Sequence, residues 1–237
     1  MNDFDQMTTN ESKFEKVYYA KMATKKETLP HFTFKYKDES GQYVEVDKIL
    51  TTLKGNLTNI ETSEYTYEGN VIKTVKLYIT LNTTLVILTC SYTQILRSII
   101  NSLINLDHKP REISIQLYQN KQGYNSCYFL VDGKIANWKF PADDMKKFVD
   151  TAVVGKKTVT SCDRLDEMLE RELVLNVVNR FYRGSEPEVP ETDEASLFAS
   201  NEAGIPISEE TDVDDFFAGS EPFVPPAGSN TSKTKKK

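Results

Sequence analysis

The chain contains 237 residues, of which 39% are hydrophobic, and it carries a formal net charge of −6. It has no apolar run approaching about 18 residues, no signal-peptide pattern and only three widely spaced cysteines, which excludes membrane-spanning and disulfide-framework classes and favours a cytoplasmic protein. This size accommodates one medium domain with a tail, or two small domains.

Charge divides the chain into a body and a tail. Residues 184–222 include twelve acidic residues and no lysine or arginine, and the last seven residues include four lysines. The body, residues 1–183, holds 25 of the 29 basic and 23 of the 35 acidic residues, so it is slightly basic. We therefore predict a mobile N-terminal segment (1–28), a folded domain (29–183) and a disordered acidic tail (184–237).

The folded domain is predicted to begin with a β-hairpin over residues 31–46, which turns at Ser40-Gly41. Aromatic and basic side chains alternate along its first strand, so the two kinds fall on opposite faces. Phe32, Phe34 and Tyr36 share one face, and Thr33, Lys35 and Lys37 share the other. This alternation suits either a half-buried strand with an aromatic core face or a nucleic-acid platform.

Residues 53–131 carry the pattern on which the predicted fold depends. Three strand-like runs (53–61, 71–81 and 84–90) precede an amphipathic helix (91–106) and a hairpin with strands at 112–119 and 124–131. This order, mainly β with helices, is that of an OB-fold, a five-stranded Greek-key barrel with a helix between strands 3 and 4. Gly55 is the predicted bend of the first strand. A C-terminal helix is predicted from about Asp163.

Outward-facing tyrosines and nearby lysines are the candidate binding residues of this barrel. Tyr65 and Tyr67 lie at a hairpin tip, where a ring is difficult to bury on both sides, and three further tyrosines are predicted on the exposed face of the last hairpin. Trp138, the only tryptophan, fits either a plug of the barrel or a base-stacking ring. The full candidate set is Phe34, Lys35, Tyr36, Lys37, Tyr65, Tyr67, Lys73, Lys76, Tyr78, Tyr118, Lys121, Tyr124, Tyr128, Trp138 and Lys139.

Little in the sequence indicates catalysis. His31 and His108 are the only histidines, and neither stands in a triad or at a metal-ligand spacing. The run 155–158 differs from a phosphate loop because position 150 is Asp instead of Gly, and Lys157 occupies the position of the required Ser or Thr. We therefore expect a protein that is not an enzyme and uses no cofactor and no metal.

Proteins that bind single strands combine aromatic planes for the bases with cations along the phosphate path, and this chain carries both. In element order, residues 29–140 resemble the OB-fold single-stranded DNA-binding proteins of tailed bacteriophages and, more loosely, those of bacteria. The similarity includes residues 53–60, the turn at 67–69, the helix before residue 112 and residues 132–140. The resemblance implies a protein that coats and protects single-stranded DNA in replication, recombination and repair.

The tail also resembles that family, whose acidic C-terminus ends in phenylalanine and recruits replication proteins. The matching residues here are Asp212, Asp214, Asp215, Phe216 and Phe217. Twenty residues follow them and end in lysines, so the family's terminal carboxylate is missing from the motif. The resemblance implies that this segment docks replication or recombination proteins, and its charge makes autoinhibition a second role.

Two other interpretations remain open. The chain could be a virion structural or assembly protein that uses the same sheet face as a protein interface, with the tyrosines as hot-spot residues. It could also be a carbohydrate or RNA module, since the fold class includes both. A homo-oligomer is compatible with the single-stranded DNA hypothesis.

Overall fold

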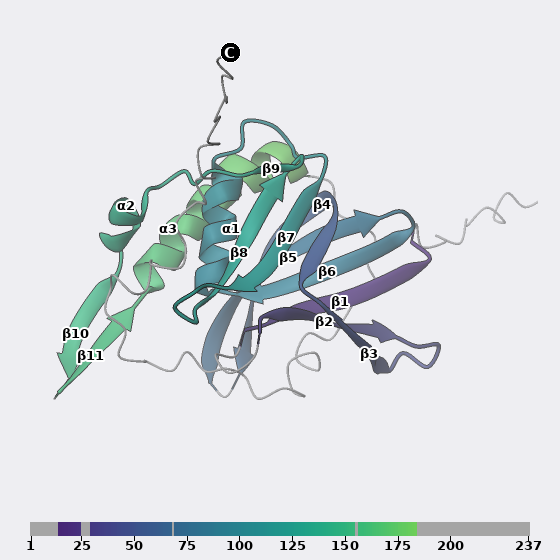
Figure 1. Cartoon of the computed structure of the whole chain (residues 1–237), viewed down its shortest axis with the longest axis horizontal. Helices are drawn as coiled ribbons and strands as arrows, with labels where there is room; N and C mark the ends of the chain where they lie inside the picture. The colour runs from purple at the N-terminus through teal and green to yellow at the C-terminus, as the bar shows by residue number, and fades with distance from the viewer. Residues whose placement is uncertain (1–13, 25–28, 68, 155, 184–237) are drawn as a thin grey trace, which may run out of the picture.

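The computed structural model describes residues 14–24, 29–67, 69–154 and 156–183, and its main feature is a nine-stranded sheet (Figure 1). In spatial order the strands are β3 (Tyr43–Leu50), β2 (His31–Lys37), β1 (Lys16–Ala23), β6 (Thr84–Ser91), β5 (Asn70–Leu81), β4 (Thr52–Tyr67), β7 (Ile113–Gln119), β8 (Asn125–Val131) and β9 (Lys134–Ile135). Neighbouring strands are antiparallel except for the parallel pair of β1 and β6. The prediction of a mainly β fold with helices is confirmed.

Strand β4 bends where the sequence places Gly55. Residues 52–55 pair with β7, whereas residues 56–67 pair with β5, so one strand belongs to two parts of the sheet. A Cβ atom on Gly55 would lie 2.6 Å from the carbonyl oxygen of Thr80 and 2.7 Å from Cγ2 of Ile79. The close approach of β4 to β5 therefore requires glycine, as expected of a residue that lets a sheet curl.

The predicted closed barrel of five strands is not what the structure shows. The expected elements are present in the expected order, as β4, β5, β6, a helix, β7 and β8, and their spatial order is β6-β5-β4-β7-β8. Closing these five strands would require β6 to pair with β8. Instead β6 pairs with β1, which leads on to β2 and β3, and the nine-stranded sheet stays open.

The N-terminal region differs from the mobile segment predicted for residues 1–28. Residues 16–23 form β1, which lies inside the sheet between β2 and β6. Its alternation explains this position: Ala20 is buried in the main core, and Tyr19 is buried on the opposite side of the sheet. Residues 1–13 and 25–28 lie outside the described part of the chain.

Helices cover one side of the sheet. They are α1 (Gln94–Ile104), α2 (Ala142–Lys146), α3 (Asp163–Leu173) and a π-helical continuation, η1 (Val174–Tyr182). Each contributes buried residues to one hydrophobic cluster, which also contains the inward residues of β2, β5, β6, β7 and β8. The prediction of a C-terminal helix near Asp163 is confirmed. Burial of these apolar stripes is the main stabilising contribution.

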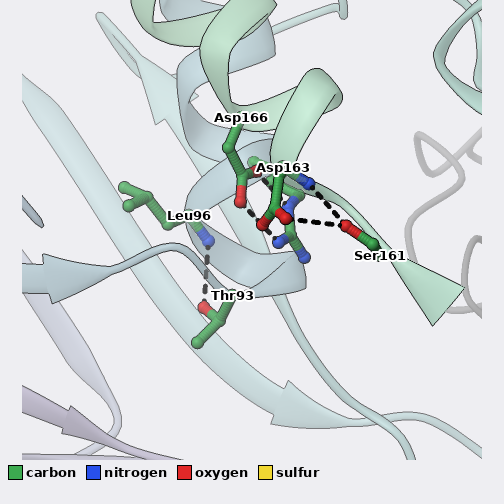
Figure 2. Close-up of polar contacts among 6 residues, drawn as sticks. Thr93, Leu96, Ser161, Asp163 and Asp166 are labelled. Carbon is green, nitrogen blue, oxygen red and sulfur yellow. Dashed lines mark hydrogen bonds and ion pairs between the residues drawn. The ribbon is translucent and has the colours of Figure 1, made fainter. Parts of the chain in front are cut away.

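Polar contacts fix the start of α1 and its packing on α3 (Figure 2). The Thr93 hydroxyl accepts a hydrogen bond from the backbone of Leu96 at 3.4 Å, which caps the helix. Arg97 donates two hydrogen bonds to the carboxylate of Asp166, at 2.6 and 2.9 Å, and both side chains are largely buried. This pair joins α1 to α3 across 69 positions of sequence, so it orients the helical layer.

A separate two-stranded sheet precedes α3. Strands β10 (Asp150–Val154) and β11 (Lys157–Ser161) pair with each other and with no strand of the large sheet among the described residues. Figure 1 shows this hairpin extending away from the body beside α2 and α3.

Candidate nucleic-acid interface

The sheet has two sides, and the helices pack against only one of them in the described part of the chain. We call the opposite side the outer face. Residues directly opposite in neighbouring strands share a face. The register places on it Tyr65, Tyr67 and Glu61 of β4, Lys76 and Tyr78 of β5, Ile87 of β6, Tyr19 and Lys21 of β1, Lys35 and Lys37 of β2, and Tyr43 and Glu45 of β3.

A small aromatic and aliphatic cluster supports the outer face. Tyr19, Tyr78, Leu85 and Ile87 are buried there, with Tyr43 partly buried beside them. Tyr19 and Tyr43 meet edge to face with 5.4 Å between their ring centroids. The hydroxyl of Tyr78 donates a 2.5 Å hydrogen bond to the Glu61 carboxylate. These rings are packed, so they form the floor of the outer face.

Four lysines surround this floor. The ammonium of Lys35 lies 3.1 Å from Glu45, and that of Lys76 lies 3.9 Å from Glu61. Lys37 lies over the ring of Tyr43, with its nitrogen 5.2 Å from the centroid. Burial, and then the charge of Lys35, lower the pKa of Lys21 to about 8. The outer face therefore concentrates positive charge in a partly desolvated setting.

Tyrosines at two hairpins offer less buried rings. Tyr65 and Tyr67 lie half-buried at the end of β4, and burial together with the proximity of Tyr67 raises the pKa of Tyr65. On β7 and β8, Tyr118 and Tyr128 stack with 4.4 Å between centroids and 16° between planes. Of the three tyrosines predicted to cluster on this hairpin, the structure brings together Tyr118 and Tyr128, whereas Tyr124 lies at the turn. Their stacked rings are already oriented as a plane on which a base could lie.

The turn between β7 and β8 holds two further candidates. Lys121 is exposed, and Tyr124 is half-buried. Tyr124 lines a hollow of about 190 Å³ together with Thr24, Gly123 and residues 93–95 at the start of α1. Asn125, in the same lining, donates a 2.8 Å hydrogen bond to the carbonyl of Thr24. This turn is thus held against the end of β1.

The five other candidates lie away from both the outer face and the β7–β8 hairpin. Phe34 is 8% exposed and belongs to the main core, so it is not available for stacking. Tyr36 shares that side of β2 and contacts Tyr18 edge to face. Lys73 is bonded to Glu170 of α3 at 3.0 Å. Trp138 packs on the main core and donates to Ser98 of α1 at 3.0 Å, with Lys139 exposed next to it.

The sequence reasoning also missed three residues of the outer face: Tyr19, Lys21 and Tyr43. Tyr19 and Lys21 were overlooked because residues 1–28 were expected to be mobile. The signal that could have found them is the run Val17-Tyr18-Tyr19-Ala20, whose β-forming residues suit a strand. Tyr43 was within the predicted hairpin, but only the tertiary pairing brings it to Tyr19.

Three remaining points concern the acidic docking residues, metal ligands and membrane-spanning helices. The proposed docking residues Asp212, Asp214, Asp215, Phe216 and Phe217 lie outside the described residues. Within residues 14–183, as far as they are described, no group of three or more His, Cys, Asp or Glu side chains is placed to hold a metal ion. No described helix is long and apolar enough to cross a membrane.

These observations define a mainly β protein with an open, mixed sheet, a helical layer on one side and a basic, tyrosine-bearing face on the other. Comparison with protein-family models, curated proteins and solved structures found no match for this chain.

Proposed function

We propose that the protein binds single-stranded DNA without strong sequence preference, through the outer face and the tyrosines of its two hairpins. The observation that carries the proposal is the register, which gathers Lys21, Lys35, Lys37 and Lys76 around a tyrosine floor on the side opposite the helices. Cations along a backbone path beside aromatic rings are what sequence-tolerant single-strand binding requires.

The residues divide into two roles. Phosphates contact the lysines, and a phosphate near Lys35 or Lys76 competes with the carboxylates of Glu45 and Glu61 that now face them. Bases stack on the half-buried rings at the hairpins, where each good stack contributes roughly 1–3 kcal/mol. The buried rings of Tyr19 and Tyr78 hold the lysines in place and do not stack.

We further propose that β4, β5, β6, α1, β7 and β8 are an OB-fold that has been opened and extended. Two features support this: the order of the elements and the bend at Gly55, which lets β4 serve both β5 and β7. In this interpretation β1, β2 and β3 occupy the edge of β6 at which the barrel would otherwise close.

The cellular role follows from the resemblance of the sequence to phage single-stranded DNA-binding proteins. We propose coating of single strands during replication, recombination and repair in the cytoplasm, with residues 212–217 docking partner proteins. The acidic composition of residues 184–222 supports docking to a basic surface and also competition with DNA.

Fluorescence anisotropy with labelled oligo-dT at several salt concentrations tests the proposal. We expect binding that weakens with salt, with a slope of about −0.7 per phosphate contact in a log–log plot. Replacing Lys35 and Lys76 together by Gln should reduce that slope, whereas replacing the exposed Lys48 should not. Absence of binding, or binding independent of salt, would contradict the proposal and favour a protein interface on the same face.

A further inference from the structure

The hairpin of β10 and β11 stands apart from the rest of the fold. Five residue pairs, from Asp150 with Ser161 to Val154 with Lys157, hold it together. Both strands lack a second neighbouring strand among the described residues. Figure 1 shows the hairpin extending from the body, close to the start of α3. An isolated two-stranded hairpin is marginally stable in water. This hairpin therefore adds little to the stability of the fold, and we looked for a binding role.

The end of the hairpin combines apolar and positively charged side chains. Val153 and Val154 are 74% and 66% exposed, which is unusual for two adjacent valines. Lys157 lies opposite Val154, and Lys156 is next to it; both lysines are exposed. The ion pairs found between described residues include neither lysine. Asp150, the hairpin's one acidic residue, lies at the other end and is bonded to Arg164 at 3.0 Å.

We propose that this hairpin is a second contact for the nucleic acid, in which Lys156 and Lys157 bind phosphates while Val154, on the same face as Lys157, packs against bases. The inference rests on the proposed function and adds a site outside the outer face. Charge complementarity selects the ligand, because a polyanion is the partner most strongly attracted by two adjacent lysines that have no acidic partner among the described residues. Apolar side chains beside cations are a combination that proteins use at unstacked bases.

The lysines of the hairpin and those of the outer face differ in the groups that a bound phosphate would displace from them. On the outer face, Lys35 and Lys76 already have carboxylates beside them, at 3.1 and 3.9 Å. At the hairpin the lysines have no such partner among the described residues, so a phosphate displaces only water and counterions. The hairpin should therefore contribute fully to the salt dependence of binding.

A length series tests this, because only a long strand can engage both sites. We compare oligo-dT of about 10 nucleotides, near the span of one compact binding face, with oligo-dT of about 40 nucleotides. The test variant is Lys156→Ser with Lys157→Ser in the full chain. The matched control is Lys146→Ser with Lys147→Ser, which removes the same charge from α2, where both lysines already pair with acidic residues.

We expect the hairpin variant to bind the long strand several-fold more weakly at low salt and to lose about 1.4 from the salt slope, which corresponds to two phosphate contacts. Its affinity for the short strand should equal that of the unmodified chain. A second variant, Val154→Thr, keeps a β-branched residue and should weaken long-strand binding without changing the slope, whereas Val153→Thr on the opposite face should leave binding unchanged. The control should keep its slope on both lengths.

Each other outcome has a distinct meaning. If the unmodified chain binds neither oligonucleotide, the proposed function fails. If it binds both, but the hairpin variant keeps the full slope on the long strand, the hairpin inference alone is wrong. If the variant instead changes the sedimentation coefficient of the free protein, or binds DNA more tightly, the hairpin docks a second copy or the acidic tail, which also overturns the inference. Circular dichroism verifies that each variant is folded.

Discussion

At the scale of single residues, Lys21 gives the outer face a dependence on pH. It lies in β1 on the same face as Lys35 of β2 and Lys76 of β5, and Glu45 of β3 and Glu61 of β4 share that face. Burial, and then Lys35, lower the pKa of its ammonium to about 8. The free protein therefore loses this charge as the pH rises through about 8.

We predict that affinity for single-stranded DNA falls between pH 7 and pH 9. A bound phosphate stabilises the ammonium and raises its pKa, so the complex holds a proton that the free protein releases. Above the pKa of the free protein, affinity then decreases by up to about tenfold per pH unit. Lys21→Arg should remove this dependence, because arginine stays charged. Anisotropy titrations across this range provide the measurement, with Lys134→Arg as control. A full chain with constant affinity would exclude a phosphate contact at Lys21.

Trp138 presents a choice between packing and stacking, and its contacts favour packing. The ring lies against the main core and donates to Ser98 of α1. Trp138→Ala should lower the free energy of unfolding by about 3 kcal/mol, measured by urea denaturation. Affinity for DNA should change little. Trp138→Phe, which retains an aromatic ring but loses the hydrogen bond, should cost less. A large loss of affinity with unchanged stability would assign the ring to binding instead.

At the scale of elements, the bend of β4 depends on one residue. Gly55→Ala places a methyl group 2.6 Å from a backbone oxygen of β5 and 2.7 Å from Ile79, and a backbone atom cannot move aside as a flexible side chain would. We predict a loss of roughly 1–3 kcal/mol or more in the free energy of unfolding. Asn56→Ala, at the exposed neighbouring position, should be nearly neutral. Equal stability of the two variants would show that β4 can bend without glycine.

The strands also show why the predicted face was correct for some candidate residues and wrong for others. Alternation along β7 and β8 was predicted correctly, since Ile115 and Phe129 point inward as expected. For β2 the sequence left the aromatic face open between core and nucleic-acid platform, and the structure places Phe32 and Phe34 in the core. Lys73 shares its face of β5 with Val75 and Leu77, so it contacts Glu170 of α3 and not the outer face. Whether an aromatic or basic face meets helices or solvent is a property of the layers, which alternation alone does not reveal.

At the scale of the whole molecule, the distribution of charge between body and tail yields a further prediction. Removing residues 184–237 should tighten binding to single-stranded DNA at low salt, because twelve acidic residues on the same chain as the basic face compete with phosphates at high effective concentration. The gain should shrink with salt, since the Debye length is about 8 Å at physiological ionic strength.

Two truncated chains separate the contributions of the tail. A chain ending before Gly219 loses the terminal lysines but keeps most of the acidic residues, so it should bind more weakly than one ending before Gly184. Anisotropy gives the affinities, and thermal unfolding monitors the fold. Equal affinities at low salt, or a lower melting temperature for the shorter chain, would contradict a competing role for the tail.

The sequence by itself determined the elements with strong local periodicity. The order of β4, β5, β6, α1, β7 and β8, the bend at Gly55 and the C-terminal helix were all readable, because amphipathic alternation and glycine act over a few neighbouring residues. Several members of the candidate site followed from the same patterns, notably Lys35, Lys76, Tyr65 and the stacked pair of Tyr118 with Tyr128.

Only the tertiary structure decided which strands become neighbours. The parallel pairing of β1 with β6 depends on contacts between residues more than 60 positions apart, and no local pattern specifies it. That pairing keeps the sheet open, brings Tyr19 and Lys21 onto the outer face and joins Tyr43 to them. The helices then cover the other side, which places Phe34 and Lys73 there. Strand partners are selected by the total apolar surface that the finished sheet buries, and that quantity belongs to the whole fold.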